Sequence, residues 1–127
     1  MTYQELLDRI NEKIDKAGIL KQDIAANLNM EANNLSRILS GDNTKIYRCL
    51  DLLDSVGLEF TFNSKPMTCH QDVIDFVDRY KSESINKISL KAKIAFSTAN
   101  NFFAGENVRM GSVLKILDAM GIEVRVV

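Results

Sequence analysis

Apolar residues recur every three to four positions along most of the chain, which is the period of a helix with one buried face. In the N-terminal half this pattern predicts helices at residues 3–17, 21–28, 32–39 and 46–56. In the C-terminal half it predicts helices at residues 69–81, 85–92, 96–103 and 110–120. The second and third helices of each half are too short to be stable alone, so they must pack on the others.

The apolar period shortens to two at residues 58–62 and again at 122–126, which predicts one short strand at the end of each half. A lone strand leaves its backbone amides unpaired, so we expect these two strands to pair with each other. Residues 63–66, which hold the only proline, are predicted to be the linker. The expected fold class is therefore mainly α, with four helices and one short strand in each half.

The two halves repeat one pattern, because residues 40–62 match residues 104–126 at a constant offset of 64. The identical pairs are Gly41/Gly105, Asn43/Asn107, Leu50/Leu114, Leu53/Leu117, Asp54/Asp118, Gly57/Gly121 and Glu59/Glu123. The first helices are offset by 66 instead, so two residues are missing from the following loop in the second copy, where such changes are tolerated. A duplicated unit is indicated, with modules at residues 1–63 and 64–127.

Residues that favour helix ends support these boundaries. The predicted N-terminal caps are Thr2 with Glu5, Thr68 with Gln71, Asn43 or Thr44, and Asn107. Gly57 and Gly121 are predicted to end the fourth helix of each half in a left-handed conformation.

The composition is that of a soluble globular protein, with 46% hydrophobic and 26% charged residues. No apolar run approaches the roughly 18 to 20 residues that span a bilayer. The N-terminus is polar and unlike a signal peptide. We therefore expect a cytoplasmic protein without membrane association.

The residues that could carry catalysis or hold a metal are few. Two cysteines and one histidine cannot form a four-ligand zinc site. Cys49 lies on an apolar helical stripe and is predicted to be a buried thiol. Cys69 and His70 are adjacent, so their side chains point in different directions. The sequence predicts no enzyme, no cofactor and no metal.

Residues 21–41, KQDIAANLNMEANNLSRILSG, read as a helix, a tight turn and a second helix, with the small Ala25 where the helices would cross. At Ile24-Ala25, Leu28-Asn-Met30 and the tail from Leu35 to Gly41, this segment resembles the helix-turn-helix module of the phage-repressor and Cro type, the Xre-like family. The resemblance covers residues 3–57 and, more weakly, 69–121. The added strand looks like that of small regulators and of antitoxins from toxin-antitoxin systems.

This resemblance implies that the second helix of the motif enters the major groove of DNA. Burial of Leu35, Ile38 and Leu39 in the first copy, and of Ala99, Phe102 and Phe103 in the second, leaves short polar side chains exposed. The predicted base-contacting residues are Asn33, Asn34, Ser36, Arg37, Ser97, Thr98, Asn100 and Asn101. Asn forms two hydrogen bonds with adenine, Arg forms two with guanine, and Ser or Thr can bond to either base.

Further polar residues are predicted to flank the groove and to reach phosphates. They are Gln22, Asn43, Lys45, Asn107, Arg109 and Lys87, with Lys91 and Lys93 beside the second copy. The net charge is −1, with −3 in residues 1–64 (7 Lys+Arg, 10 Asp+Glu) and +2 in residues 65–127 (9 and 7). Because local cations decide phosphate contact, a slightly acidic chain is compatible with a DNA ligand.

The second copy departs from the family pattern at three positions. Ser89 replaces the crossing alanine, Phe96 occupies a site that is otherwise polar, and Asn101 replaces Arg37. An exposed Phe96 could contact a thymine methyl group or could mark a surface that binds protein.

The sequence thus predicts a DNA-binding transcriptional regulator whose two fused modules act as a pseudo-dimer, as a monomer or as a homodimer. Its partner would be double-stranded DNA, read as an imperfect palindrome. The alternative is an antitoxin or a phage or plasmid immunity protein that binds mainly another protein, such as a toxin, through its acidic first helix or Phe96.

Overall fold

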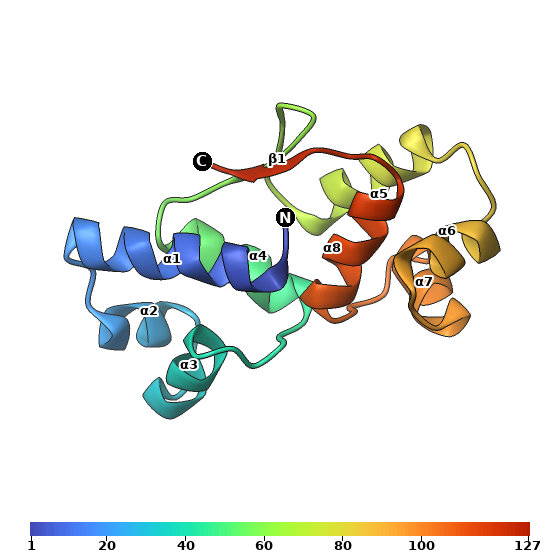
Figure 1. Cartoon of the computed structure of the whole chain (residues 1–127). Coiled ribbons are helices and arrows are strands. Elements are labelled where there is room, and N and C mark those ends of the chain that lie inside the picture. The colour runs from blue at the N-terminus through green and yellow to red at the C-terminus, as the bar shows by residue number, and fades with distance from the viewer.

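The computed structural model describes residues 1–127 as eight helices and three short strands (Figure 1). The helices are α1 (Tyr3–Ala17), α2 (Lys21–Asn27), α3 (Ala32–Leu39), α4 (Ile46–Ser55), α5 (His70–Tyr80), α6 (Ile85–Ala92), α7 (Phe96–Phe103) and α8 (Met110–Ala119). The strands are β1 (Phe60–Phe62), β2 (Lys65–Met67) and β3 (Val124–Val126). The predicted mainly α class is confirmed. None of the helices combines the length and the apolar character that crossing a membrane requires.

The first predicted capping box is present at the start of α1. The Thr2 hydroxyl accepts from the Glu5 amide at 3.1 Å, and the Glu5 carboxylate accepts from the Thr2 amide at 3.4 Å. Gly18, with φ of 65°, ends the helix in the left-handed region. The helix buries Leu7, Ile10 and other apolar residues of the same face.

The second predicted capping box, Thr68 with Gln71, is wrong. The Thr68 amide and hydroxyl both donate to one carboxylate oxygen of Asp72, at 3.0 and 2.6 Å, and Gln71 donates instead to Asp75. A carboxylate accepts charge-assisted hydrogen bonds that a neutral amide cannot match. Helix α5 therefore begins at His70, after Cys69.

The predicted pairing of the two terminal strands is confirmed. Strands β1 and β3 are antiparallel, with Thr61 opposite Arg125 at the centre of the register. Because β1 belongs to the N-terminal half and β3 to the C-terminal half, their hydrogen bonds join the two halves of the chain in one sheet.

The prediction that residues 63–66 form a plain linker is wrong. Asn63 and Ser64 have positive φ values of 48° and 70° and make a two-residue turn, after which β2 pairs with β1. Asn adopts this conformation readily, and such turns suit hairpins. Strand β2 lies at the edge of the sheet, in the order β2-β1-β3, where Pro66 is tolerated.

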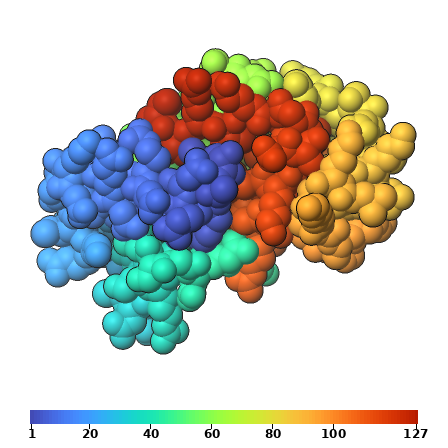
Figure 2. All heavy atoms as spheres, in the orientation of Figure 1, coloured from blue at the N-terminus to red at the C-terminus, as the bar shows by residue number.

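One apolar core runs through both halves of the chain. It includes Phe60 and Phe62 of β1 and the apolar faces of α4 and α8, which pack against each other. Figure 1 shows α8 near the middle of the molecule, with α2 and α3 at one end and α6 and α7 at the other. In the space-filling view the start and the end of the chain meet along the visible face (Figure 2). The predicted burial of Cys49 in this core is confirmed.

Candidate nucleic-acid interface

Helices α2 and α3 pack against each other and are joined by a tight turn at Asn29. Asn29 has φ of 53°, and Lys93, 64 positions later between α6 and α7, has φ of 57°. Left-handed residues of this kind reverse the chain within a few positions. Ala25 is buried, as expected for a small residue between two helices.

The facing predicted for residues 32–39 is confirmed. Helix α3 buries Leu35 and Leu39 and half-buries Ile38. The four predicted contact residues, Asn33, Asn34, Ser36 and Arg37, are all exposed. None of their side chains is engaged in a hydrogen bond or ion pair with the rest of the chain, so their polar groups are free to bind a ligand.

Helix α7 differs from its predicted facing at two positions. Ala99 and Phe102 are buried as predicted, Phe103 is half-buried instead of buried, and Ser97, Asn100 and Asn101 are exposed. Thr98 is half-buried instead of exposed, because it lies one turn before Phe102 on the flank of the buried stripe.

Ser89 and Phe96, the two other positions at which the second copy departs from the expected pattern, differ in their surroundings. Ser89 is 2% exposed, and its hydroxyl donates to the Asn86 carbonyl at 2.8 Å. The buried hydroxyl is therefore satisfied, and serine is accommodated where Ala25 stands in the first half. Phe96 is 52% exposed at the start of α7.

Four predicted flanking residues lie together where the two halves meet. Asn43 accepts, through its side-chain oxygen, from the Gly111 amide of α8 at 2.9 Å. Asn107 accepts from the Tyr47 amide of α4 at 3.0 Å. Lys45 and Arg109 form an antiparallel bridge between the two loops. Each asparagine therefore caps a helix of the other half.

The prediction that Asn43 or Thr44, and Asn107, cap the helix that follows them in sequence is wrong. The loops before α4 and α8 stay extended and pair with each other, through the amides of Ile46 and Met110 and the carbonyls of Val108 and Thr44, both at 2.8 Å. This pairing carries each asparagine across to the opposite helix. Its side-chain oxygen then satisfies an amide that the first turn leaves without a partner.

The residues predicted to contact phosphates differ in whether their side chains already have a partner within the protein. Arg109 is exposed and donates to the Asn43 carbonyl at 2.6 Å, whereas the Lys45 ammonium has no partner. Gln22, Lys87 and Lys93 are exposed with free side-chain polar groups. Lys91 instead forms an ion pair with Glu83.

Three side chains that the sequence did not single out hold the α2–α3 pair in place. Arg48 donates to the Leu28 carbonyl at 2.8 Å, and Asn11 donates to the Leu39 carbonyl at 3.1 Å. Each bond satisfies a carbonyl at a helix end. Tyr3 donates to the Asp42 carbonyl at 2.6 Å and accepts from the Thr44 amide at 3.2 Å, and its burial raises the pKa of its phenol. No local spacing signals these long-range partners.

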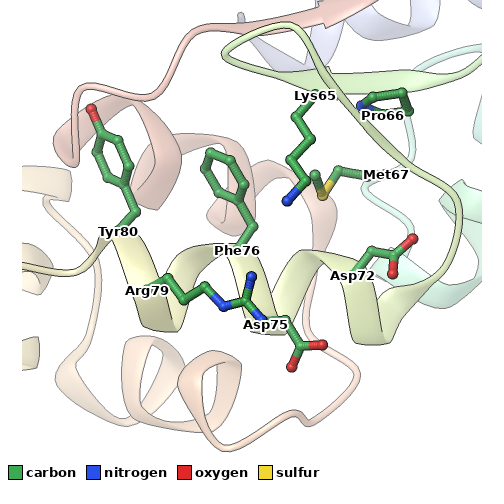
Figure 3. Close-up of a pocket in the computed structure, with 8 residues that line it drawn as sticks. All are labelled: Lys65, Pro66, Met67, Asp72, Asp75, Phe76, Arg79 and Tyr80. Carbon is green, nitrogen blue, oxygen red and sulfur yellow. The ribbon is translucent and has the colours of Figure 1, made fainter.

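An open cavity of about 460 Å³ lies between β2 and α5, away from the residues predicted to contact DNA. Figure 3 shows Phe76 and Tyr80 side by side, with Arg79 extended toward Asp75. The two rings stack at 5.8 Å with 11° between their planes. No group of three His, Cys, Asp or Glu side chains in the structure could hold a metal ion.

Comparison of the chain with protein-family models, with curated proteins and with solved structures found no match.

Proposed function

We propose that the protein is a cytoplasmic, sequence-specific DNA-binding regulator with two helix-turn-helix modules in one chain. The observation that carries the proposal is the outer face of α3, where Asn33, Asn34, Ser36 and Arg37 are exposed without partners above a buried stripe. Amide and guanidinium groups match the donor and acceptor patterns of adenine and guanine in the major groove. Lys45 and Arg109 would contact phosphates between the two modules.

The pairs that join the halves support a pseudo-dimer. Lys45 bridges Arg109, and Thr61 faces Arg125, and in each pair the two positions differ by 64, the offset of the sequence repeat. In a twofold dimer a residue on the axis meets its own copy, and every other contact occurs twice. The bonds of Asn43 to Gly111 and of Asn107 to Tyr47 obey the second condition. In this proposal α3 and α7 bind two unlike half-sites.

The proposal is tested on the intact protein by selecting duplexes from a random library and measuring affinity at fixed salt. Replacing Asn33 or Arg37 by Ala is expected to weaken binding to the selected duplex about tenfold to a hundredfold and to relax base preference. Arg125→Ala, which removes an exposed arginine from β3 in the sheet, is the matched control and should leave both unchanged. Failure to select any sequence at low and at moderate salt would refute the proposal.

A second candidate function, binding of a protein partner by an antitoxin or by a phage or plasmid immunity protein, is favoured by one observation. Leu90 is 69% exposed and Phe96 is 52% exposed, on α6 and α7. Exposed apolar side chains of this size are frequent in interfaces. A partner that co-purifies stoichiometrically and is lost with Phe96→Ser, from a protein that selects no DNA sequence, would establish this function instead.

A further inference from the structure

A second cavity, of about 570 Å³, lies between the start of α1 and one face of α8. Figure 1 shows the N-terminal end of α1 next to α8. Both halves line it, since Tyr3 and Glu5 come from α1, Asn43 from the loop before α4, and Ser112, Lys115 and Asp118 from α8. Its volume is within the range of about 300 to 1,000 Å³ of small-molecule sites.

A smaller cavity, of about 400 Å³, lies at the corresponding place between α4 and the start of α5. Tyr47 lines it at the position that corresponds, 64 residues earlier, to Gly111. The Tyr47 ring packs edge-on against His70 at 4.6 Å. A glycine in place of this tyrosine leaves the α1–α8 cavity without such a ring, so the pair of cavities is unequal.

The charges of the two cavities also differ. Lys115 stands where the smaller cavity has Asp51, while Asp118 corresponds to Asp54. Lys115, Asp118 and Glu5 belong to none of the four ion pairs of the molecule. The α1–α8 cavity thus offers the ammonium group of Lys115 and the carboxylate of Asp118 without partners. It also offers the Glu5 carboxylate, whose partner is the Thr2 amide of the capping box.

We propose that the α1–α8 cavity binds a small zwitterion of the amino-acid class. The ligand carboxylate binds the Lys115 ammonium and the Ser112 hydroxyl, and the ligand ammonium binds Asp118 and Glu5, with Leu114 beneath its apolar part. A simple anion would leave the carboxylates unpaired, and a simple amine would leave Lys115 unpaired. A molecule that carries both charges therefore binds both kinds of group in the cavity at once.

Two of the lining residues connect this cavity to the contact between the halves. Asn43 caps α8 through Gly111, and Tyr3 holds the loop of Asp42 and Thr44. A ligand in this cavity lies beside Asn43 and Tyr3 and is expected to stabilise the loop that they hold. An effect on DNA affinity rests on the proposed function, whereas ligand binding itself does not.

The test is calorimetric titration of the intact protein, without DNA, with each of the common L-amino acids at neutral pH. At least one is expected to bind with Kd of about 1 mM or tighter, and its decarboxylated and deaminated analogues at least about tenfold more weakly. Lys115→Met should weaken binding about tenfold or more. Asp51→Asn, at the corresponding position of the other cavity, is the control and should not change affinity.

The proposal is overturned if no amino acid binds, or if Lys115→Met binds as the native protein does. Because Lys115 is exposed, its substitution is expected to leave the melting temperature unchanged, which is checked first. Slower hydrogen exchange of the Gly111 amide with ligand is the expected sign of coupling to the loop, and unchanged exchange would contradict that coupling. Binding in a protein that selects no DNA sequence would refute the proposed function and leave this site standing.

Discussion

At the scale of single residues, the two positions that reverse the chain between short helices are chemically unequal. Asn29 and Lys93 have nearly the same left-handed φ, 53° and 57°. Asparagine tolerates this region because its short side chain can bond locally, whereas a lysine has no such compensation. The second turn therefore carries strain that the first does not.

Replacing Lys93 by Gly is expected to raise the free energy of unfolding by about 0.5 to 1 kcal/mol, because relief of strain exceeds the added freedom of the unfolded chain. Urea denaturation measures the change. Lys93→Ala removes the same charge but keeps the strain, so it is the matched control. Equal stability of the two variants would contradict the account.

His70 gives the stability of the protein a defined pH dependence. Burial against Tyr47 lowers the pKa of His70 below its ordinary value of 6.5. As the pH falls below 6.5, the unfolded chain takes up a proton at this residue before the folded chain does, so the free energy of unfolding decreases. Well above pH 6.5 both states are neutral and the effect vanishes.

We expect His70→Gln to flatten the decrease in the free energy of unfolding between pH 7 and the lowered pKa of His70. Denaturation at a series of pH values measures both proteins. Carboxylates contribute equally to the two curves, so the difference between them isolates the histidine. Parallel curves for the native protein and the variant would show that His70 is not the titrating group.

At the scale of elements, the sequence predicts the helices and strands, because these depend on the local period of apolar residues. The helices begin and end within a few residues of their predicted bounds, and β1 pairs with β3. The failures are contacts between distant segments. Asn43 caps a helix 68 positions away at Gly111, and no pattern near Asn43 records that partner. The sequence does not predict the turn at Asn63 and Ser64, because Pro66, two residues later, disfavours a strand except at a sheet edge.

Asn43 and Asn107 each cap a helix of the opposite half, so replacing either residue is predicted to lower stability. Asn43→Ala and Asn107→Ala should each lower the free energy of unfolding by about 1 kcal/mol, because each leaves a helix amide without its acceptor. Asn43→Asp keeps the acceptor and places a negative charge at the start of α8, so it should retain stability. Thermal or urea unfolding compares the three, and an alanine variant as stable as the native protein would exclude capping.

At the scale of the whole molecule, the two halves share one core and one sheet. Phe60 and Phe62 are each 1% exposed, and the strand that carries them pairs with β3 of the other half. A domain of about 60 residues buries a smaller share of its surface than a larger domain does, so its stability alone is marginal. The halves therefore depend on each other for stability.

A fragment of residues 1–63 is expected to lack a cooperative unfolding transition, whereas the full chain should unfold in a single one. Circular dichroism during thermal unfolding distinguishes the two cases. A fragment that melts cooperatively, or a full chain with two separate transitions, would mean that the shared core is not required.

The candidate interface was predictable as a set of exposed residues but not as an arrangement. Helical periodicity alone assigned Asn33 and Arg37 to the outer face of α3. It could not reveal that Asn43, Lys45, Asn107 and Arg109 meet at one junction, because their pairing depends on how the halves pack.

A hydroxyl-radical footprint of the intact protein on a selected duplex tests most directly whether two modules in one chain read DNA. Two bound modules protect two segments on one face of the duplex, separated by one helical turn of about 34 Å, and Asn33→Ala loses protection at one segment only. Uniform protection, or the same pattern on a shuffled duplex, would contradict binding by two modules.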